Sequence, residues 1–304
     1  MTTTLVTGAA GFTGTWMIET LRRHGHRVVA AVHSPTQTDA DLTLSADLTQ
    51  PEQVAALVEQ AKADYVIHLA ALAFVGHDDP AAFYRVNVLG TENLLNALAA
   101  LETKPTRVLV ASSANVYGDT DQSILDEQQP PAPVNHYACS KLAMEHMART
   151  FRHRLALVIA RPFNYTGPGQ DTRFLIPKIV DHFARDCREI ELGNTHVSRD
   201  FSDVRDVVSA YLGLLEAPWQ PEHSGEVVNV CSGVATPLNE VIEHMNRLTG
   251  YTIDVQVNPA FVRANEIKSL RGSDARLIER LGQPRTLTPL ADTLSDMLTA
   301  MRAG

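Results

Sequence analysis

The sequence predicts an α/β protein built on a doubly wound parallel sheet, with a smaller α/β lobe formed mainly by the C-terminal half. Short β-rich runs alternate with amphipathic helical segments through the first half. These runs are apolar on both faces, which is typical of parallel strands covered by helices on each side. Beyond residue 161, segments rich in Gly, Pro and Asn separate shorter elements, so a second, smaller region is expected there.

The expected elements follow in chain order. The first strand lies over Thr3–Thr7, and a glycine-rich turn leads from it into a helix over about residues 12–24. Pro51 begins a helix as its first residue, a position where proline sacrifices no hydrogen bond. The remaining strands are expected over Arg27–Val32, Tyr65–Leu69, Arg107–Ala111 and Leu155–Ala160, and the remaining helices over 80–100, 136–152 and 204–215.

Composition excludes several classes of protein. The chain has 304 residues and a net charge of -9, from 35 acidic and 26 basic side chains, which argues against binding to polymeric nucleic acid or anionic membranes. Its three cysteines form no CxxC pair, so neither a metal site nor a disulfide framework is expected. The N-terminus does not resemble a signal peptide, and no apolar stretch reaches the roughly 18 residues of a membrane helix. We therefore expect a soluble, cytoplasmic protein.

Gly8, Gly11 and Gly14 lie between the first strand and the first helix. Glycines in that place let the backbone approach a dinucleotide pyrophosphate at the helix N-terminus. Their spacing is one residue wider at its start than the usual fingerprint, and a plain strand–helix turn is the alternative interpretation.

The end of the second strand bears on the choice of cofactor. An acidic residue there would bind the adenosine ribose and repel a 2′-phosphate, but the chain has His33 and Ser34. NADP(H) is therefore favoured, with NAD(H) as the alternative. Asp47 is placed either to reach the adenine or to lie near the start of the next helix.

Tyr137 and Lys141 are four residues apart on a predicted helix and so share one face. A neighbouring ammonium would lower the pKa of the phenol toward a range useful for proton transfer. Ser112 and Ser113 end a predicted strand, at the edge of the sheet where α/β proteins bind ligands. The glycine-rich turn, the strand-end serine and the Tyr/Lys helix agree with one another in order and spacing.

The motifs VTGAAGFTG, HLAA, NVLGTENLL, SSANVYG, YACSK, ARPFNYTGPGQ and SRDFSDVRDVVSAYL span almost the whole chain. Through them the sequence resembles the extended short-chain dehydrogenases/reductases, whose core is a Rossmann fold. LGNTHVSRDF, NVCSG and RANEIKSLRGSDARLIERLG are similar to segments of the enzymes of GDP-mannose metabolism. The resemblance implies an NAD(P)H-dependent oxidoreductase that reduces the C4 keto group of a nucleotide-linked 4-keto-6-deoxyhexose, in the first place a GDP-linked one.

The resemblance also implies roles for matched residues. Ser113 would hydrogen-bond the substrate carbonyl, Tyr137 would be the acid/base, and Lys141 would hold the nicotinamide ribose. Besides the glycines and the residues after the second strand, the implied cofactor contacts are Phe12, Thr13, Leu48, Leu69, Ala70, Ala71, Asn87, Tyr137, Lys141 and Arg161. The implied substrate contacts are Phe74, Asn115, Asn164, Lys178, Leu192, Arg199, Arg263 and Glu266, with Lys178, Arg199 and Arg263 as a basic cluster for a diphosphate.

The same reasoning divides the chain. Residues 1–161 form the expected dinucleotide-binding domain, to which 200–230 return, and 162–199 with 231–304 form the nucleotide-sugar lobe. In the family, the helices near 91–101 and 136–152 pair across a two-fold axis, so a homodimer through a four-helix bundle is expected.

Three other activities remain open at this point. The Ser/Tyr/Lys set does not separate a reductase from a nucleotide-sugar 4-epimerase. A GDP-mannose 4,6-dehydratase needs a carboxylic acid just after the catalytic serine, where this chain has Ala114 and Asn115. A non-catalytic NADP-binding regulator is disfavoured because such relatives commonly lose the Tyr/Lys pair.

Overall fold

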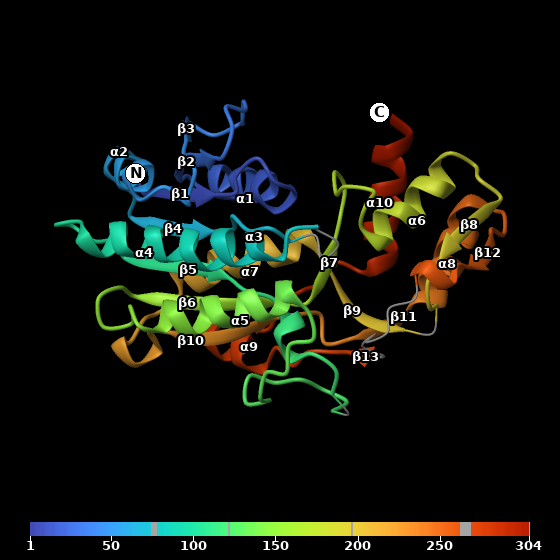
Figure 1. Ribbon diagram of the computed structural model, residues 1–304. Coiled ribbons are helices and arrows are strands. Elements are labelled where there is room, and N and C mark those ends of the chain that lie inside the picture. Colours follow the sequence, from blue (N-terminus) through green and yellow to red (C-terminus); the bar gives the residue numbers. More distant parts are fainter. Residues whose placement is uncertain (74–77, 121, 196, 262–268, 304) are drawn as a thin grey trace.

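The structure is a computed structural model that describes residues 1–304 except 74–77, 121, 196, 262–268 and 304. Its centre is a seven-stranded parallel sheet in the order β10-β6-β5-β4-β1-β2-β3 (Figure 1). The predicted doubly wound fold is confirmed, because the strand order runs outward from β1 in both directions. The strands are β1 (Thr3–Thr7), β2 (Arg27–Val32), β3 (Leu42–Ser45), β4 (Tyr65–His68), β5 (Arg107–Ala111), β6 (Leu157–Pro162) and β10 (Glu226–Val230).

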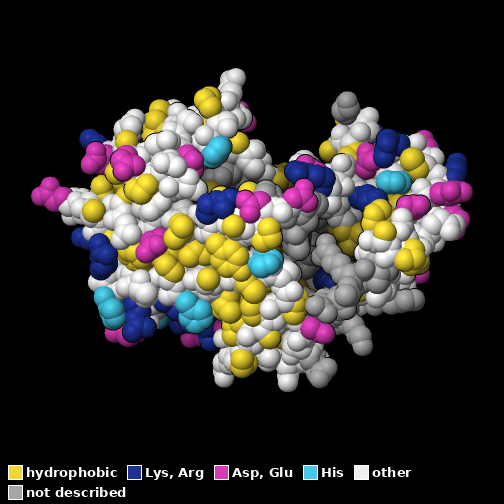
Figure 2. Space-filling view, in the orientation of Figure 1, with side chains coloured by type: hydrophobic (Ala, Val, Ile, Leu, Met, Phe, Trp, Pro, Cys, Tyr) yellow, Lys and Arg dark blue, Asp and Glu magenta, His cyan; other side chains and the backbone are white. Residues whose placement is uncertain are grey.

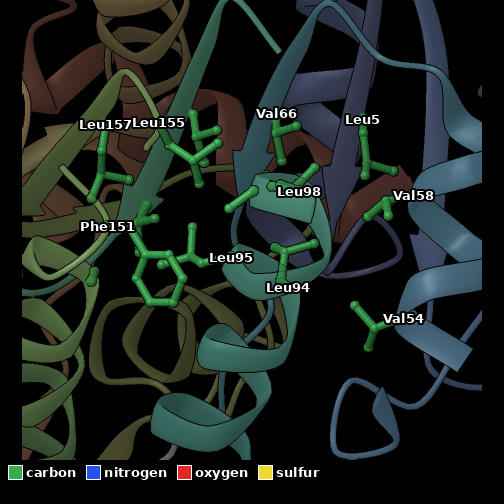
Figure 3. Packing of buried hydrophobic residues seen from close by; sticks show 14 of the residues in the cluster. Leu5, Val54, Val58, Val66, Leu94, Leu95, Leu98, Phe151, Leu155 and Leu157 are labelled. Carbon is green, nitrogen blue, oxygen red and sulfur yellow. The ribbon is translucent and has the colours of Figure 1, made fainter. Parts of the chain in front are cut away.

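Two hydrophobic clusters cover the two faces of this sheet. Consecutive strand residues point to opposite faces, so Leu5 lies in one cluster and Val6 in the other. The first cluster packs under α2 (Pro51–Ala61), α4 (Thr91–Ala100) and α5 (His136–Arg149), as Figure 3 shows for residues such as Leu94 and Leu98. The second lies under α1 (Phe12–Arg23), α7 (Val204–Glu216) and α9 (Ala275–Leu281).

Two predicted elements differ in detail from the structure. The single helix expected over 80–100 is α3 (Pro80–Tyr84), a π-helical segment η1 (Arg85–Gly90) and then α4. The strand expected over Leu155–Ala160 lies two residues further on, as β6, because Val227 to Val230 of β10 pair with Ile159 to Pro162. The π-helical turn places Asn87 in the interior, next to α5.

A smaller lobe lies beside the sheet (Figure 1). Its own core joins α6 (Leu175–Ala184), α8 (Leu238–Thr249) and α10 (Leu290–Ala303). Strand β9 (Ser198–Asp203) pairs with β7 (Asn164–Thr166), β11 (Ala235–Pro237) and β13 (Ser269–Leu270), and β8 (Glu189–Leu192) pairs with β12 (Asp254–Val257). Figure 2 shows the surface hollowed between the two parts.

The chain crosses between the two parts more than once. After β9 it returns to the sheet through α7 and β10, and later through α9, whose Leu277 lies in the second cluster of the sheet. The remaining short helices are η2 (Ala114–Tyr117), η3 (Pro221–His223) and η4 (Pro259–Phe261). In the described ranges, no helix is long and apolar enough to cross a membrane.

Because β1, β4, β5 and β6 are parallel, their carboxyl ends meet at one edge of the sheet. The glycine-rich turn follows β1, the Leu69–Ala71 loop follows β4, the serines follow β5, and Phe163 follows β6. The topology thus gathers the separately predicted motifs at one edge, at the point where the strand order reverses between β1 and β4.

Candidate active site

The glycine-rich turn is a close-packed cradle. Gly8 has a φ of +68°, and a Cβ there would lie 2.7 Å from the backbone nitrogen of Ala70. A Cβ on Gly14 would lie 2.4 Å from the carbonyl oxygen of Gly8. Gly11 precedes α1 and has no side chain with which to cap it. The first N–H groups of α1 are therefore available to an anion, and the turn fits a pyrophosphate.

The adenosine end of a dinucleotide would lie beside this turn. His33 and Ser34 are exposed after β2, with 3.2 Å between His33 Nδ1 and Ser34 Oγ. A cavity of about 350 Å³ adjoins the turn. Apart from Ala10 in the turn, the sequence did not predict the residues that line it. They are Ala10, Thr15, Ile18, Thr36, Gln37, Thr38 and Asp39. Both features leave room for an adenosine and its 2′-phosphate.

Asp47 does not cap α2, since the residue before that helix is Gln50. Its Oδ1 accepts hydrogen bonds from the backbone nitrogen and hydroxyl of Thr49, at 2.9 and 2.8 Å. The backbone hydrogen bond from Thr49 is the largest cause that holds the pKa of Asp47 below its usual value, with a smaller contribution from nearby His33. The carboxylate is therefore ionised near the expected adenosine site.

A buried histidine fixes the loop after β4. His68 Nδ1 lies 2.7 Å from Thr7 Oγ1 and Nε2 lies 2.8 Å from Thr91 Oγ1. Thr91 donates its own proton to the Asn87 carbonyl, so it accepts from Nε2–H, and Nδ1 accepts from Thr7. Burial lowers the pKa of His68 to about 3 and keeps it neutral. Because Thr7 Oγ1 also accepts from the Ala70 nitrogen at 3.2 Å, the network holds the loop against the turn.

The side chain of Asn87 makes hydrogen bonds to other residues of the protein. Its Oδ1 accepts from the Leu72 nitrogen at 2.8 Å, and its Nδ2 donates to the Leu72 carbonyl and to Ser140 Oγ, at 3.2 and 3.0 Å. Ser140 in turn donates to the Tyr137 carbonyl at 2.7 Å. The sequence implied a cofactor contact for Asn87; the structure shows a residue that positions the loop after β4 and the start of α5.

Ser113, Tyr137 and Lys141 come together as expected. All three are buried, and the two helical residues lie one turn apart on α5. Ser113 precedes η2, its Oγ accepts from the Asn115 nitrogen at 3.2 Å, and it hydrogen-bonds Tyr137. Lys141 Nζ donates to the Ala111 carbonyl at 2.8 Å. The serine at the end of β5 and the phenol on α5 therefore face the same site.

The expected effect of Lys141 on the phenol is not seen. Burial raises the pKa of Tyr137 to about 12, and the Ser113 hydrogen bond offsets only part of this. Burial also lowers the pKa of Lys141 to about 8, and its ammonium is directed at Ala111. In this state the phenol is a protonated donor and not a phenolate, because its loss of solvent outweighs the effect of its neighbours.

Arg161, which was expected to bind the cofactor, has a buried side chain with partners inside the protein. Its guanidinium pairs with Glu145 through two hydrogen bonds of 2.8 and 2.6 Å, and the Arg161 side chain is only 4% exposed. It also lies 4.7 Å from the centre of the Tyr117 ring. Glu145 accepts from Ser112 Oγ at 2.5 Å as well. This buried pair ties α5 and β6 to the serine segment, and the cofactor contact expected of Arg161 stays a prediction.

The expected substrate residues lie on both parts of the molecule. Asn164 is exposed on β7, and Asn115 is half-buried next to Ser113. Leu192 is 2% exposed in the core of the lobe, so its side chain is not available as a substrate contact. Phe74, Arg263 and Glu266 lie outside the described residues.

The two described members of the expected basic cluster already have partners. Lys178 Nζ donates to the Glu191 carbonyl at 2.7 Å and lies 4.7 Å from the centre of the Phe261 ring. Arg199 Nη1 donates to the Ser198 carbonyl at 2.9 Å. Both belong to the lobe. The described parts of the chain contain no group of three or more His, Cys, Asp or Glu placed to hold a metal ion.

Sequence reasoning missed two neighbours of the site. Glu145 stands four residues after Lys141, and that helical spacing was a usable signal. Tyr165 had no signal beyond its place in ARPFNYTGPGQ; its hydroxyl lies 2.8 Å from Thr13 Oγ1 in the glycine-rich turn.

Comparison with known proteins agrees with the resemblance that the sequence motifs indicate. The family model described as NAD dependent epimerase/dehydratase family matches residues 4–231. GDP-6-deoxy-D-talose 4-dehydrogenase of Aggregatibacter actinomycetemcomitans is 34% identical, over 96% of both chains. GDP-6-deoxy-D-mannose reductase of Pseudomonas aeruginosa is 36% identical, over 98% of this chain and 97% of the relative.

Two solved structures extend these similarities. A protein of Burkholderia cenocepacia J2315, which carries the provisional description of an epimerase, is 48% identical with a TM-score of 0.92, covering 100% of this chain and 99% of that one. The RMD protein of Pseudomonas aeruginosa, solved in complex with NADPH, is 32% identical with a TM-score of 0.85, covering 100% and 98%. The similarity extends over both parts of the molecule.

Proposed function

This chain belongs to the NAD dependent epimerase/dehydratase family, and we propose that it reduces the C4 keto group of GDP-4-keto-6-deoxy-D-mannose. At the coarser level the chain is an NAD(P)-dependent oxidoreductase of nucleotide-linked sugars. The finer assignment is supported by one observation above all: the two curated relatives are named for GDP sugars that differ only in their configuration at C4.

That difference identifies a shared compound. 6-Deoxy-D-talose and 6-deoxy-D-mannose are C4 epimers, so oxidation at C4 removes the difference and gives the same 4-keto sugar. A dehydrogenase named for one and a reductase named for the other therefore have the GDP-4-keto-6-deoxyhexose in common. The product configuration depends on which face of that sugar receives the hydride.

The residues of the site suit this reduction. When bound, the nicotinamide supplies the hydride that adds to C4. Ser113 hydrogen-bonds the carbonyl oxygen, and Tyr137, whose high pKa keeps it protonated, donates a proton to that oxygen. Lys141 holds the nicotinamide ribose and stabilises the phenolate that Tyr137 leaves behind.

The cofactor we favour is NADPH. No carboxylate follows β2, and exposed His33 and Ser34 provide donors for a 2′-phosphate. The Pseudomonas aeruginosa RMD structure was solved with NADPH, which supports the same choice. NADH is the alternative, in keeping with the description of the family.

We assign the dinucleotide to residues 1–161 with 200–230, and the nucleotide sugar to the lobe of 162–199 and 231–304. Asn164, Lys178 and Arg199 then lie on the sugar-nucleotide side. Amide donors suit the sugar, and cationic donors suit the diphosphate. Without such cations, the overall negative charge of the chain would repel the diphosphate.

A 4-epimerase is the second candidate, supported by the description of the Burkholderia cenocepacia structure. It would use the same serine, tyrosine and lysine, but would return the hydride to the sugar and consume no cofactor. A 4,6-dehydratase is disfavoured, because buried Ala114 and the amide Asn115 follow Ser113 where a proton-transferring acid is needed.

Removal of the Tyr137 hydroxyl separates proton transfer from ligand binding. Tyr137→Phe should abolish NADPH oxidation with GDP-4-keto-6-deoxy-D-mannose, because the substitution removes the phenol that donates the proton to the carbonyl oxygen, while the dissociation constants of NADPH and GDP stay within about twofold of wild type. The measurement is the loss of absorbance at 340 nm beside a binding titration. Turnover like that of the wild type in this variant would remove Tyr137 from the chemistry.

A further inference from the structure

A segment on the lobe side of the molecule contacts the glycine-rich turn directly. The Tyr165 hydroxyl lies 2.8 Å from Thr13 Oγ1, and the Tyr165 ring stacks on Phe12 with 6.2 Å between centroids and 13° between planes. Trp16 Nε1 donates to the Pro168 carbonyl at 3.1 Å. Tyr165 and Pro168 follow β6 at the junction of the two parts, where Figure 1 labels β7. The contact therefore lies at the end of α1 that binds the expected pyrophosphate.

The Thr13 and Tyr165 hydroxyls carry two protons, and their mutual hydrogen bond uses only one of them. Each hydroxyl carries a single proton, and only one proton can lie between the two oxygens. Over the described ranges, neither Tyr165 nor Thr13 has a further side-chain acceptor. Burial raises the pKa of Tyr165, so its phenol stays protonated and remains a donor. The second proton is therefore available to a ligand.

The position of the pair indicates which ligand. Thr13 is the second residue of α1, where backbone N–H groups have no acceptor inside the helix. An anion held at these groups would lie beside the hydroxyl pair. The Tyr165 phenol also lies close enough to Tyr137 to disfavour the phenolate of that residue. The pair thus stands between the anion site and the catalytic tyrosine.

We propose that Tyr165, through its hydroxyl pair with Thr13, is a cofactor-binding residue that donates a hydrogen bond to the nicotinamide-side phosphate of the dinucleotide. The inference rests on the proposed function, because it concerns the same cofactor site. It adds a contact from the opposite side of the cleft to those from the turn. Binding of the dinucleotide would then fasten the segment that carries Asn164 to the turn.

The test compares two ligands in one variant. NADPH carries the diphosphate bridge, whereas adenosine 2′,5′-bisphosphate keeps the adenosine end and lacks the nicotinamide-side phosphate. In Tyr165→Phe the dissociation constant of NADPH should rise about tenfold, the typical effect of losing a hydrogen bond to a charged group. The dissociation constant of the bisphosphate should stay within twofold. If wild type prefers NADH, the pair becomes NADH and AMP.

Three controls make the result decisive. Thr13→Val should reproduce the effect, and the double variant should bind no more weakly than either single one, because the hydroxyls act as a unit. Thr13→Val also provides the test if Tyr165→Phe does not fold. Tyr251→Phe removes a hydroxyl that donates to the Cys187 carbonyl inside the lobe, and should leave both constants unchanged.

The proposal is overturned if Tyr165→Phe binds NADPH as wild type does. Equal weakening of both ligands also overturns it, since that result means a disturbed turn and not a lost phosphate contact. A wild-type chain that binds neither NADPH nor NADH would instead refute the proposed function itself, so the two failures are distinguishable.

Discussion

At the scale of single residues, burial decides the protonation states in the site. Tyr137 has a pKa raised to about 12, and Lys141 has a pKa lowered to about 8, each mainly because its charged form loses water. A reductase needs a protonated phenol and a charged ammonium at the start of the reaction. The protonated phenol of Tyr137 and the charged ammonium of Lys141 are present together near neutral pH. A dehydrogenase, which runs the reaction in the opposite direction, would need the phenolate.

A pH profile follows from these two values. Above about pH 8 Lys141 loses its proton and no longer stabilises the phenolate formed at Tyr137, so kcat/KM for reduction should fall. Tyr137 adds no limb below about pH 12. Lys141→Arg, with a side chain that stays charged, should lack this limb even at a reduced rate. A wild-type profile that is flat from pH 7 to 10 would contradict the assignment.

At the scale of elements, the turn between β1 and α1 depends on close backbone contact. Gly14→Ala places a Cβ 2.4 Å from the Gly8 carbonyl oxygen, which cannot move without opening the turn. We expect a loss of about 1–3 kcal/mol of unfolding free energy, in the range of overpacked sites, and NADPH binding weakened about tenfold or more. Thermal unfolding and titration measure the two effects.

Gly213→Ala is the matched control. Gly213 also lies in a helix, α7, but a Cβ there meets only the end of the flexible Leu281 side chain, at 2.6 Å. NADPH affinity should be unchanged in this variant. Equal effects of the two substitutions on NADPH affinity would show that the turn has no special part in binding.

The sequence predicted elements far better than it predicted contacts. Strands such as Thr3–Thr7 and Arg107–Ala111 were located because period and composition are local properties. The glycines and the Ser/Tyr/Lys set were recognised for the same reason. A motif does not tell whether a side chain faces a ligand or a buried partner, so it gave no sign that the side chains of Arg161 and Leu192 are buried. Tyr165 and Thr13 are 152 residues apart, and nothing local to either position indicates the contact.

At the scale of the whole molecule, we propose a homodimer through α4 and α5. Figure 2 shows apolar side chains gathered over the face where Figure 1 labels α5. Leu89, just before α4, is 50% exposed, and Leu142 and Ala143 of α5 are only partly buried. Such exposed or partly buried apolar side chains would be covered by a second copy of the chain.

The dimer is tested by one charge introduced at Leu89. Leu89→Glu should shift the mass measured by light scattering from twice that of one chain to that of one chain, because a carboxylate would be buried without a partner. Leu248→Glu alters a leucine of similar exposure, 43% exposed on α8 of the lobe, and should leave the mass unchanged. A wild-type chain that is monomeric at micromolar concentration would refute the dimer.

The nucleotide of the sugar substrate can be identified by one comparison of rates. The kcat/KM of NADPH oxidation is compared for the 4-keto-6-deoxyhexoses linked to GDP, UDP and dTDP. We predict stoichiometric oxidation with the GDP-linked sugar, at a kcat/KM at least about a hundredfold above the others, since mismatched polar contacts to the base are costly. A preference for the UDP- or dTDP-linked sugar, or interconversion of C4 epimers without net oxidation of NADPH, would contradict the assignment as a reductase of a GDP-linked 4-keto sugar.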